Sequence, residues 1–146
     1  MTAAAEKLSG GCLCGAVRFA AVAEKREMDV CHCNMCRRWS GGVLMTVPCT
    51  DVEVADDTQL GVYPSSEWGE RVFCRACGTS LFWRQRSGEG HVAVAFPSLD
   101  NAVGLAFAEE IFIDEKPELY AFVGERRRKT GEQVIAEFHA AQEGRQ

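Results

Sequence analysis

Seven of the eight cysteines in this chain of 146 residues fall into three short groups. The groups have the forms Cys-x-Cys, Cys-His-Cys-x-x-Cys and Cys-x-x-Cys, and their members are Cys12 and Cys14, then Cys31, Cys33 and Cys36, then Cys74 and Cys77. Such spacings are typical of tetrahedral zinc sites with thiolate ligands. Two such sites need eight ligands, so seven thiolates favour one closed site and one site with a free position. The chain is therefore expected to bind two zinc ions.

The spacing also predicts which cysteines share an ion. Cys12 and Cys14 would face the same side of an extended strand. Gly78 directly follows Cys74-x-x-Cys77 and suits a tight turn in which both sulfurs converge. A metal shared by these two pairs closes a loop of about sixty residues and so restricts the unfolded chain. We expect the structural zinc at this site.

The middle group is the better candidate for an open, catalytic site. Cys31, Cys33 and Cys36 lie within six residues, so a single local turn could fold all three sulfurs around one cation. Cys49 could complete this site and close it, but we interpret Cys49 as a small buried hydrophobic residue. His32 lies between two expected ligands, and in an extended segment its side chain would point away from them.

The elements that must position these groups are mainly β-strands. Short runs in which apolar and polar residues alternate are separated by turn residues. The expected strands are residues 10–19, 42–47, 52–54, 61–63, 71–73, 80–83, 91–96 and 110–114. Only residues 131–142, with apolar side chains at helical spacing, predict a helix. We expect residues 1–10 to be a frayed leader and the basic run 126–129 to be the solvated start of that helix.

Composition limits the class of protein. The chain is 47% hydrophobic, enough for one domain over residues 1–146, with a core of about 10–123 and a helical tail at 124–146. The formal net charge of −5 gives no general attraction to nucleic acid or to an anionic membrane, so neither is an expected partner. The sequence shows no secretory signal and no membrane span, which predicts a cytoplasmic protein. In that reducing compartment disulfides are a poor explanation for eight cysteines.

Three cysteine-containing stretches, residues 11–19, 31–41 and 73–82, together resemble the glutathione-dependent formaldehyde-activating enzyme (GFA) family, also called the centromere-protein-V-like domain. Residues 98–100 and 111–116 extend the resemblance, which runs from about residue 10 to about 120. Two positions depart from the usual family pattern: Glu110 stands where a histidine is usual and Leu119 where a tryptophan is common.

The resemblance implies a mainly β, Mss4-like fold of small stacked antiparallel sheets around zinc, with a short C-terminal helix. It implies a structural zinc on Cys12, Cys14, Cys74 and Cys77 and a catalytic zinc on Cys31, Cys33 and Cys36. The implied reaction is that of a carbon–sulfur lyase, the addition of glutathione to formaldehyde to give S-(hydroxymethyl)glutathione. The implied partners are thus a small-molecule thiol and a small aldehyde.

Four residues directly after the middle group could bind this substrate. Arg37, Ser40, Gly41 and Gly42 could hold a carboxylate of glutathione or polarise an aldehyde oxygen. The alternative is that Arg37 is a surface residue and the glycines only shape a turn.

Two other functions compete with the lyase. A zinc-scaffolded binding module without catalysis would gain support if Cys49 were a fourth ligand of the middle site. A zinc-scaffolded redox protein would need a free nucleophilic cysteine, and Cys49 is the one left for that role.

Overall fold

The computed structural model describes residues 7–101 and 103–143, which form two compact units. The first unit comprises residues up to 28 together with 45–106, and the second comprises 29–44 and everything from 107. The expected leader at 1–6 and the last tail residues, 144–146, lie outside the described residues. Each unit contains the cysteines of one of the two expected zinc sites.

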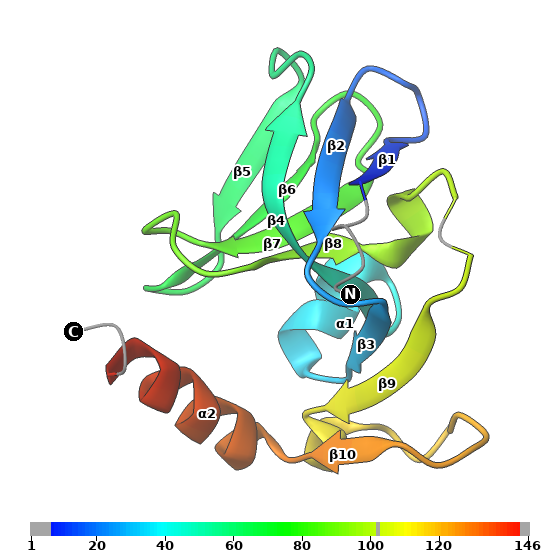
Figure 1. Ribbon diagram of the computed structural model, residues 1–146, viewed down its shortest axis with the longest axis vertical. Coiled ribbons are helices and arrows are strands. Elements are labelled where there is room, and N and C mark those ends of the chain that lie inside the picture. The colour runs from blue at the N-terminus through cyan, green and yellow to red at the C-terminus, as the bar shows by residue number, and fades with distance from the viewer. Residues whose placement is uncertain (1–6, 102, 144–146) are drawn as a thin grey trace, which may run out of the picture. The chain divides into compact units, whose positions relative to one another are not determined.

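The first unit is built from antiparallel strands (Figure 1). In order of pairing these are β1 (Lys7–Gly11), β2 (Arg18–Ala23), β4 (Leu44–Val54), β8 (Val92–Ala95), β7 (Ser80–Gln85), β6 (Gly69–Cys74) and β5 (Leu60–Pro64). A short 3₁₀ helix, η1 (Phe96–Ser98), follows β8. Alternate residues of β2, namely Phe19, Ala21 and Ala23, are buried, as expected for a strand with one face on the core.

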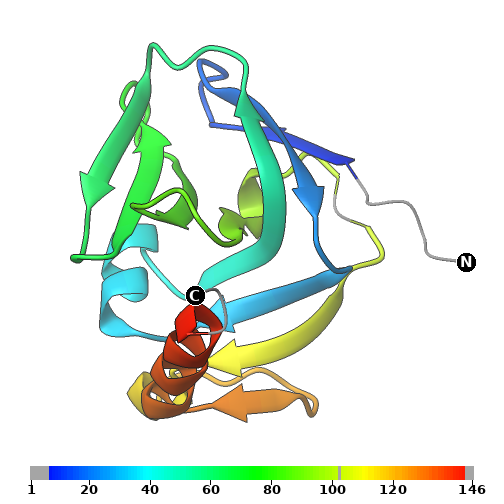
Figure 2. The same ribbon diagram turned by 60° about the vertical axis from the view of Figure 1, so that its left-hand side comes forward.

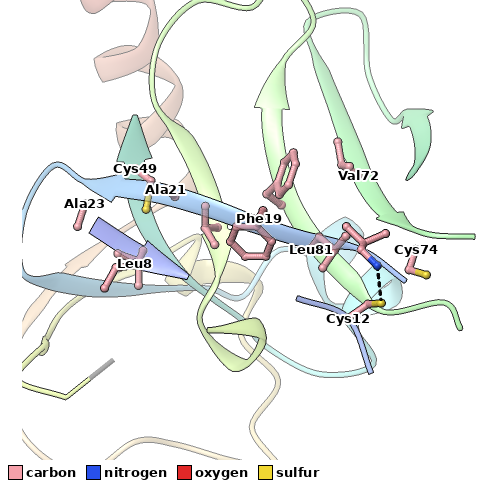
Figure 3. Packing of buried hydrophobic residues seen from close by; sticks show 13 residues of the cluster. Leu8, Cys12, Phe19, Ala21, Ala23, Cys49, Val72, Cys74 and Leu81 are labelled. Carbon is pink, nitrogen blue, oxygen red and sulfur yellow. Dashed lines mark hydrogen bonds between the residues drawn. The ribbon is translucent and has the colours of Figure 1, made fainter. Parts of the chain in front are cut away.

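A hydrophobic core fills the first unit (Figure 3). Phe19 and Phe82 meet edge to face with ring centroids 6.0 Å apart, and Val72 and Leu81 are fully buried in the same cluster. Two cysteines of the expected structural zinc site, Cys12 and Cys74, also belong to it. The core therefore supports the two turns that carry these sulfurs.

The second unit contains β3 (Glu27–Cys31), α1 (Asn34–Ser40), β9 (Ala106–Ile111), η2 (Ile113–Glu115), β10 (Arg127–Lys129) and α2 (Gly131–Glu143). Strand β9 neighbours β3, and β10 pairs with β9 in parallel (Figure 2). Thr130 and Gln133 cap α2 reciprocally: each backbone N–H donates to the other's side-chain oxygen, at 2.8 and 3.3 Å. No helix in the described part of the chain is both long and apolar enough to cross a membrane.

The structure confirms the mainly β class and the C-terminal helix, and it corrects several local predictions. Helix α1 was not predicted, β1 lies in the expected leader, and residues 44–54 form one strand rather than two. The basic run 126–129 does not begin a helix, because 127–129 form β10 and the side chain of Arg126 is only 7% exposed. The assignment of 1–146 to one domain stays a prediction.

Candidate metal centres

The first pair of sulfurs lies in the turn between β1 and β2, and not on a strand as the sequence suggested. The amide of Cys12 donates to the carbonyl of Val17 at 3.0 Å, and Gly15, with φ +85°, donates to the carbonyl of Cys12 at 3.3 Å. This tight turn directs both side chains the same way, and the sulfurs of Cys12 and Cys14 are 3.6 Å apart. The expected convergence is present, but a turn produces it.

The second pair lies in the turn between β6 and β7. Gly78 has φ +83°, as predicted, and its amide donates to the carbonyl of Cys74 at 2.8 Å. The sulfurs of Cys14 and Cys74 are 3.9 Å apart, and all four ligand atoms of this group, Cys77 included, lie within 4.8 Å of one another.

These distances fit a zinc ion. Four sulfurs about 2.3 Å from zinc at tetrahedral angles would be about 3.8 Å from one another. A disulfide would need about 2.05 Å, and all eight cysteines are free thiols. Cys12, Cys14, Cys74 and Cys77 therefore form a four-sulfur group that could hold zinc.

Thr79 organises the charge of the four-sulfur group. Its hydroxyl accepts from the amide of Leu13 at 3.0 Å and lies 3.2 Å from the sulfur of Cys77. This hydroxyl, helped by nearby amides, lowers the pKa of Cys77 to about 5. The amide of Val17 likewise donates to the sulfur of Cys12 at 3.2 Å. Such donors stabilise thiolates, the form in which cysteine binds a metal.

The middle group is positioned by β3 and α1. Cys31 ends β3, Cys33 is the N-cap of α1, and Cys36 lies in the first turn of that helix. The amide of Cys36 donates to the sulfur of Cys33 at 3.3 Å. The three sulfurs lie within 4.8 Å of one another, so these residues could also hold a metal, with one tetrahedral position left for an outside molecule.

Crowding makes a cation the natural partner of the middle group. Contact with the thiols of Cys33 and Cys36, together with burial, raises the pKa of Cys31 far above its ordinary value. Three thiolates this close repel one another, and a divalent cation removes that repulsion. The chemistry of the donor set thus fits zinc.

The last residue of β9 and the segment after it support the middle group through hydrogen bonds to main-chain amides. The carbonyl of Ile111 accepts from the amide of His32 at 3.1 Å, and a carboxylate oxygen of Glu115 accepts from the amide of Asn34 at 3.1 Å. Phe112 packs against the group in a left-handed conformation, with φ 54°, which is unusual for a bulky residue. A Cβ at position 131 would lie only 2.7 Å from this ring, which is too close for a side chain. Glycine, which has no Cβ, therefore begins α2 as Gly131.

His32 is fully buried and uses both ring nitrogens. Nε2 lies 2.8 Å from Glu110 Oε1, and Nδ1 lies 3.0 Å from the hydroxyl of Tyr120. Burial alone would raise the pKa of Glu110, but hydrogen bonds from Arg126, His32 and Arg128 outweigh it and lower that pKa. The prediction that His32 points away from the neighbouring cysteines agrees with these contacts.

The four expected substrate residues follow the group on α1 and its C-terminus. Arg37 Nε donates to the carbonyl of His32 at 2.9 Å, and Nη2 lies 3.5 Å from the carbonyl of Glu115. Gly41 is the left-handed C-cap of α1, and the hydroxyl of Ser40 contacts the carbonyls of Cys36 and Gly42 at 2.8 and 2.6 Å. A Cβ at Gly42 would meet nothing within 4 Å. Their role in substrate binding stays a prediction.

Cys49 is a core residue of the first unit. It is fully buried in the hydrophobic cluster, and among the described residues neither sulfur group includes it. Burial, with a smaller contribution from Glu24, raises the pKa of Cys49 to about 12. This environment agrees with its interpretation as a small hydrophobic residue and makes it a poor nucleophile.

Sequence reasoning missed three side chains around the middle group: Glu110, Glu115 and Tyr120. Their contacts join positions 78 to 88 residues apart, and no local spacing indicates such pairs. The signal available was Glu110 itself, a charged residue inside an alternating strand at a position that departs from the resembled pattern.

Comparisons with known proteins agree with this geometry. The family model described as glutathione-dependent formaldehyde-activating enzyme matches residues 7–115, which include all seven clustered cysteines. A protein of Schizosaccharomyces pombe named as an uncharacterized lyase is 32% identical over 130 residues, covering 86% of this chain and 93% of its own length. A Halomonas elongata protein, provisionally named a glutathione-dependent formaldehyde-activating enzyme, is 29% identical over 85 residues, 51% of this chain and 54% of that protein.

A solved structure has a similar fold. The crystal structure of a Rhodobacter sphaeroides protein superposes with a TM-score of 0.55 at 24% sequence identity, covering 69% of this chain and the whole of the other.

Removing one sulfur from each group should separate the roles of the two sites. We expect Cys36→Ser to lose one metal equivalent while its thermal midpoint stays within about 5 °C of the parent. Cys77→Ser should lower the midpoint by more than about 10 °C, because its metal holds two distant turns together. Elemental analysis and thermal unfolding measure both quantities. Equal destabilisation by the two substitutions would contradict the separate roles.

Labelling of Cys49 should be slow and should depend on pH. A thiol with a pKa of about 12 is almost wholly protonated at pH 8, so its thiolate is about a thousand times scarcer than that of a thiol with the ordinary value of 9.0. The rate should rise about tenfold per pH unit between pH 7 and 9. Iodoacetamide labelling of the folded protein, followed by peptide mass spectrometry, measures this rate, and rapid labelling at pH 7 would revive the redox function.

Proposed function

Because the chain belongs to the glutathione-dependent formaldehyde-activating enzyme family, we propose that it is a zinc-dependent carbon–sulfur lyase that adds a thiol such as glutathione to formaldehyde or a related small aldehyde. The observation that carries the proposal is the three-sulfur group of Cys31, Cys33 and Cys36, which could bind a metal and leave one coordination position for substrate. We propose the four-sulfur group as the structural zinc site and the cytoplasm as the location of the protein.

A zinc ion held by the middle group would lower the pKa of an incoming thiol, so that thiolate is present near neutral pH. A free thiol near pKa 8.5 is already a few per cent ionised at pH 7, so ionisation contributes at most about thirtyfold. The remaining acceleration must come from positioning. In the addition a carbon–sulfur bond forms, the carbonyl π electrons move to oxygen, and that oxygen takes up the proton the thiol has lost.

Arg37 is the residue best placed to orient such a thiol. Two of the five N–H donors of its guanidinium are directed at the carbonyls of His32 and Glu115, which fixes the group beside the cysteines. The other donors can bind a carboxylate, and glutathione carries two of them. Gly42, with open space beside its Cα, lets a substrate approach the main chain closely.

Catalysis should be visible as faster exchange rather than as more product. Glutathione and formaldehyde add to each other spontaneously, and a catalyst leaves that equilibrium unchanged. We expect the protein to speed exchange between ¹³C-formaldehyde and its glutathione adduct, measured by NMR, and Cys36→Ser to return the rate to the uncatalysed value. Cys49→Ala, in the core of the first unit, is the matched cysteine control and should keep the activity.

A panel of thiols and aldehydes in the same assay identifies the substrate pair. Acceleration with another thiol alone would keep the lyase class and change its substrate. No acceleration with any pair, by protein that carries both metals, would contradict the proposal and favour the zinc-scaffolded binding module.

Substitution of Arg37 tests the binding of the carboxylate. Loss of a charge-assisted hydrogen bond costs about 1.5–3 kcal/mol, so Arg37→Met should raise KM for glutathione at least about tenfold. KM for an uncharged thiol such as 2-mercaptoethanol should change little. Arg38→Met is the matched control, because Arg38 is exposed and directs Nε to the side chain of Asn34 on its own helix. Equal effects on both thiols would assign Arg37 a purely structural role.

A further inference from the structure

The buried ring of His32 is held on both sides. Glu110 contacts Nε2 and Tyr120 contacts Nδ1, while the ring of Phe122 lies 6.1 Å away between centroids. Rotation of the imidazole would therefore break two hydrogen bonds of a fully buried side chain. The orientation of His32 is fixed by its surroundings.

The main chain of His32 is held as well. Its amide donates to the carbonyl of Ile111 at 3.1 Å, and its carbonyl accepts from Arg37 at 2.9 Å. Cys31 and Cys33 are bonded directly to this residue, so the directions of their sulfurs depend on where His32 lies. Metal affinity rises when the ligands are already oriented before the ion binds.

Glu110 is the charged end of this arrangement. One carboxylate oxygen faces His32, and the other accepts from Arg126 at 2.8 Å and from Arg128 at 2.9 Å. Arg126 is itself buried, with its guanidinium 3.9 Å from the centre of the Phe107 ring. An ionised carboxylate can only accept, so His32 Nε2 carries the hydrogen, and in the neutral ring Nδ1 accepts from Tyr120.

Glu110 needs cationic partners so close to the middle group. Three thiolates around a divalent cation would leave one negative charge, and the carboxylate of Glu110 adds another in the same unit. The guanidinium groups of Arg126 and Arg128, which both donate to Glu110, offset the charge of that carboxylate. Both arginines lie outside residues 7–115, the part of the chain that matches the family model.

We propose that Glu110, with its charge balanced by Arg126 and Arg128, is a positioning residue for the metal of the middle group and acts through His32. The inference rests on the metal site of the proposed function but not on its reaction. It assigns to the segment after residue 115 a part in tuning that metal site.

Metal release tests the proposal without measuring catalysis. A chelator should remove the two metals in two phases, and the phase missing from Cys36→Ser identifies the middle group. We expect Glu110→Gln to speed that phase about 10- to 100-fold and to leave the four-sulfur phase unchanged. The absorption bands of the cobalt-substituted middle site should also shift, because the sulfur directions change.

Glu109→Gln is the matched control. Glu109 is the neighbouring acid on β9, and it pairs with Lys129 and Arg127 instead of with His32. The Glu109→Gln substitution should leave both phases of metal release unchanged. An equal effect of the two glutamine substitutions, or an equal acceleration of both phases by Glu110→Gln, would overturn the proposal, since either result would indicate a general loss of stability.

Substitution of Arg126 gives a second test of the proposal. If Arg126 acts by balancing Glu110, Arg126→Met should speed release strongly in the parent and only weakly in the Glu110→Gln background. Additive effects would overturn the charge-balance part. If Glu110→Gln fails to fold, Tyr120→Phe carries the test, because loss of one hydroxyl should still speed the middle phase several-fold, and no change would overturn the proposal.

Failure of this inference and failure of the proposed function are distinguishable. If Glu110→Gln leaves metal release unchanged, in a protein that speeds exchange between formaldehyde and its glutathione adduct, the inference alone is overturned. A parent protein that binds a single metal, on the four-sulfur group, would overturn both.

Discussion

Mutual repulsion of crowded thiolates is the constraint on which the rest of the structure depends. Each unit brings the sulfurs of one cysteine group to within 4.8 Å of one another. Sulfurs this close cannot all be ionised without a cation, because thiolates repel one another. If the cysteines were protonated instead, they would make only weak contacts and would not bind a metal strongly. The tight turns, the cap of α1 and the hydrogen bonds to the sulfurs become favourable together only when a metal compensates the charge. At the four-sulfur group, which joins two distant turns, folding and metal binding are thus expected to be coupled.

The features that could be predicted from the sequence are those set by short spacings. The two sulfur groups, the turn at Gly78 and the C-terminal helix follow from local patterns that tolerate little variation. The pairing of Cys12 with Cys14 was anticipated for the wrong reason. Any compact local conformation, turn or strand, can direct two cysteines separated by one residue toward one ion, so the chemistry is easier to predict than the backbone.

The features that could not be predicted depend on contacts between distant residues. Helix α1 has seven residues, and its buried residue is Cys36, a proposed metal ligand, so no apolar stripe indicates the helix. The basic run at 126–129 looks like a solvated surface, because a sequence does not show that a buried carboxylate lies opposite. Arg126 and Arg128 donate hydrogen bonds to Glu110, which lies sixteen and eighteen residues earlier in the chain, and their charge offsets that of its carboxylate.

That dependence explains how this fold can hold a buried carboxylate in the same unit as the middle group. A buried carboxylate next to a cluster of thiolates is strongly unfavourable on its own, since like charges in a region of low dielectric repel and neither is solvated. Glu110 is tolerable here because Arg126, directly before β10, and Arg128, on β10, both donate to its carboxylate. In this chain the charge of residue 110 and the two arginines of the C-terminal segment therefore depend on each other, and the family match over residues 7–115 contains only the carboxylate side of that interaction.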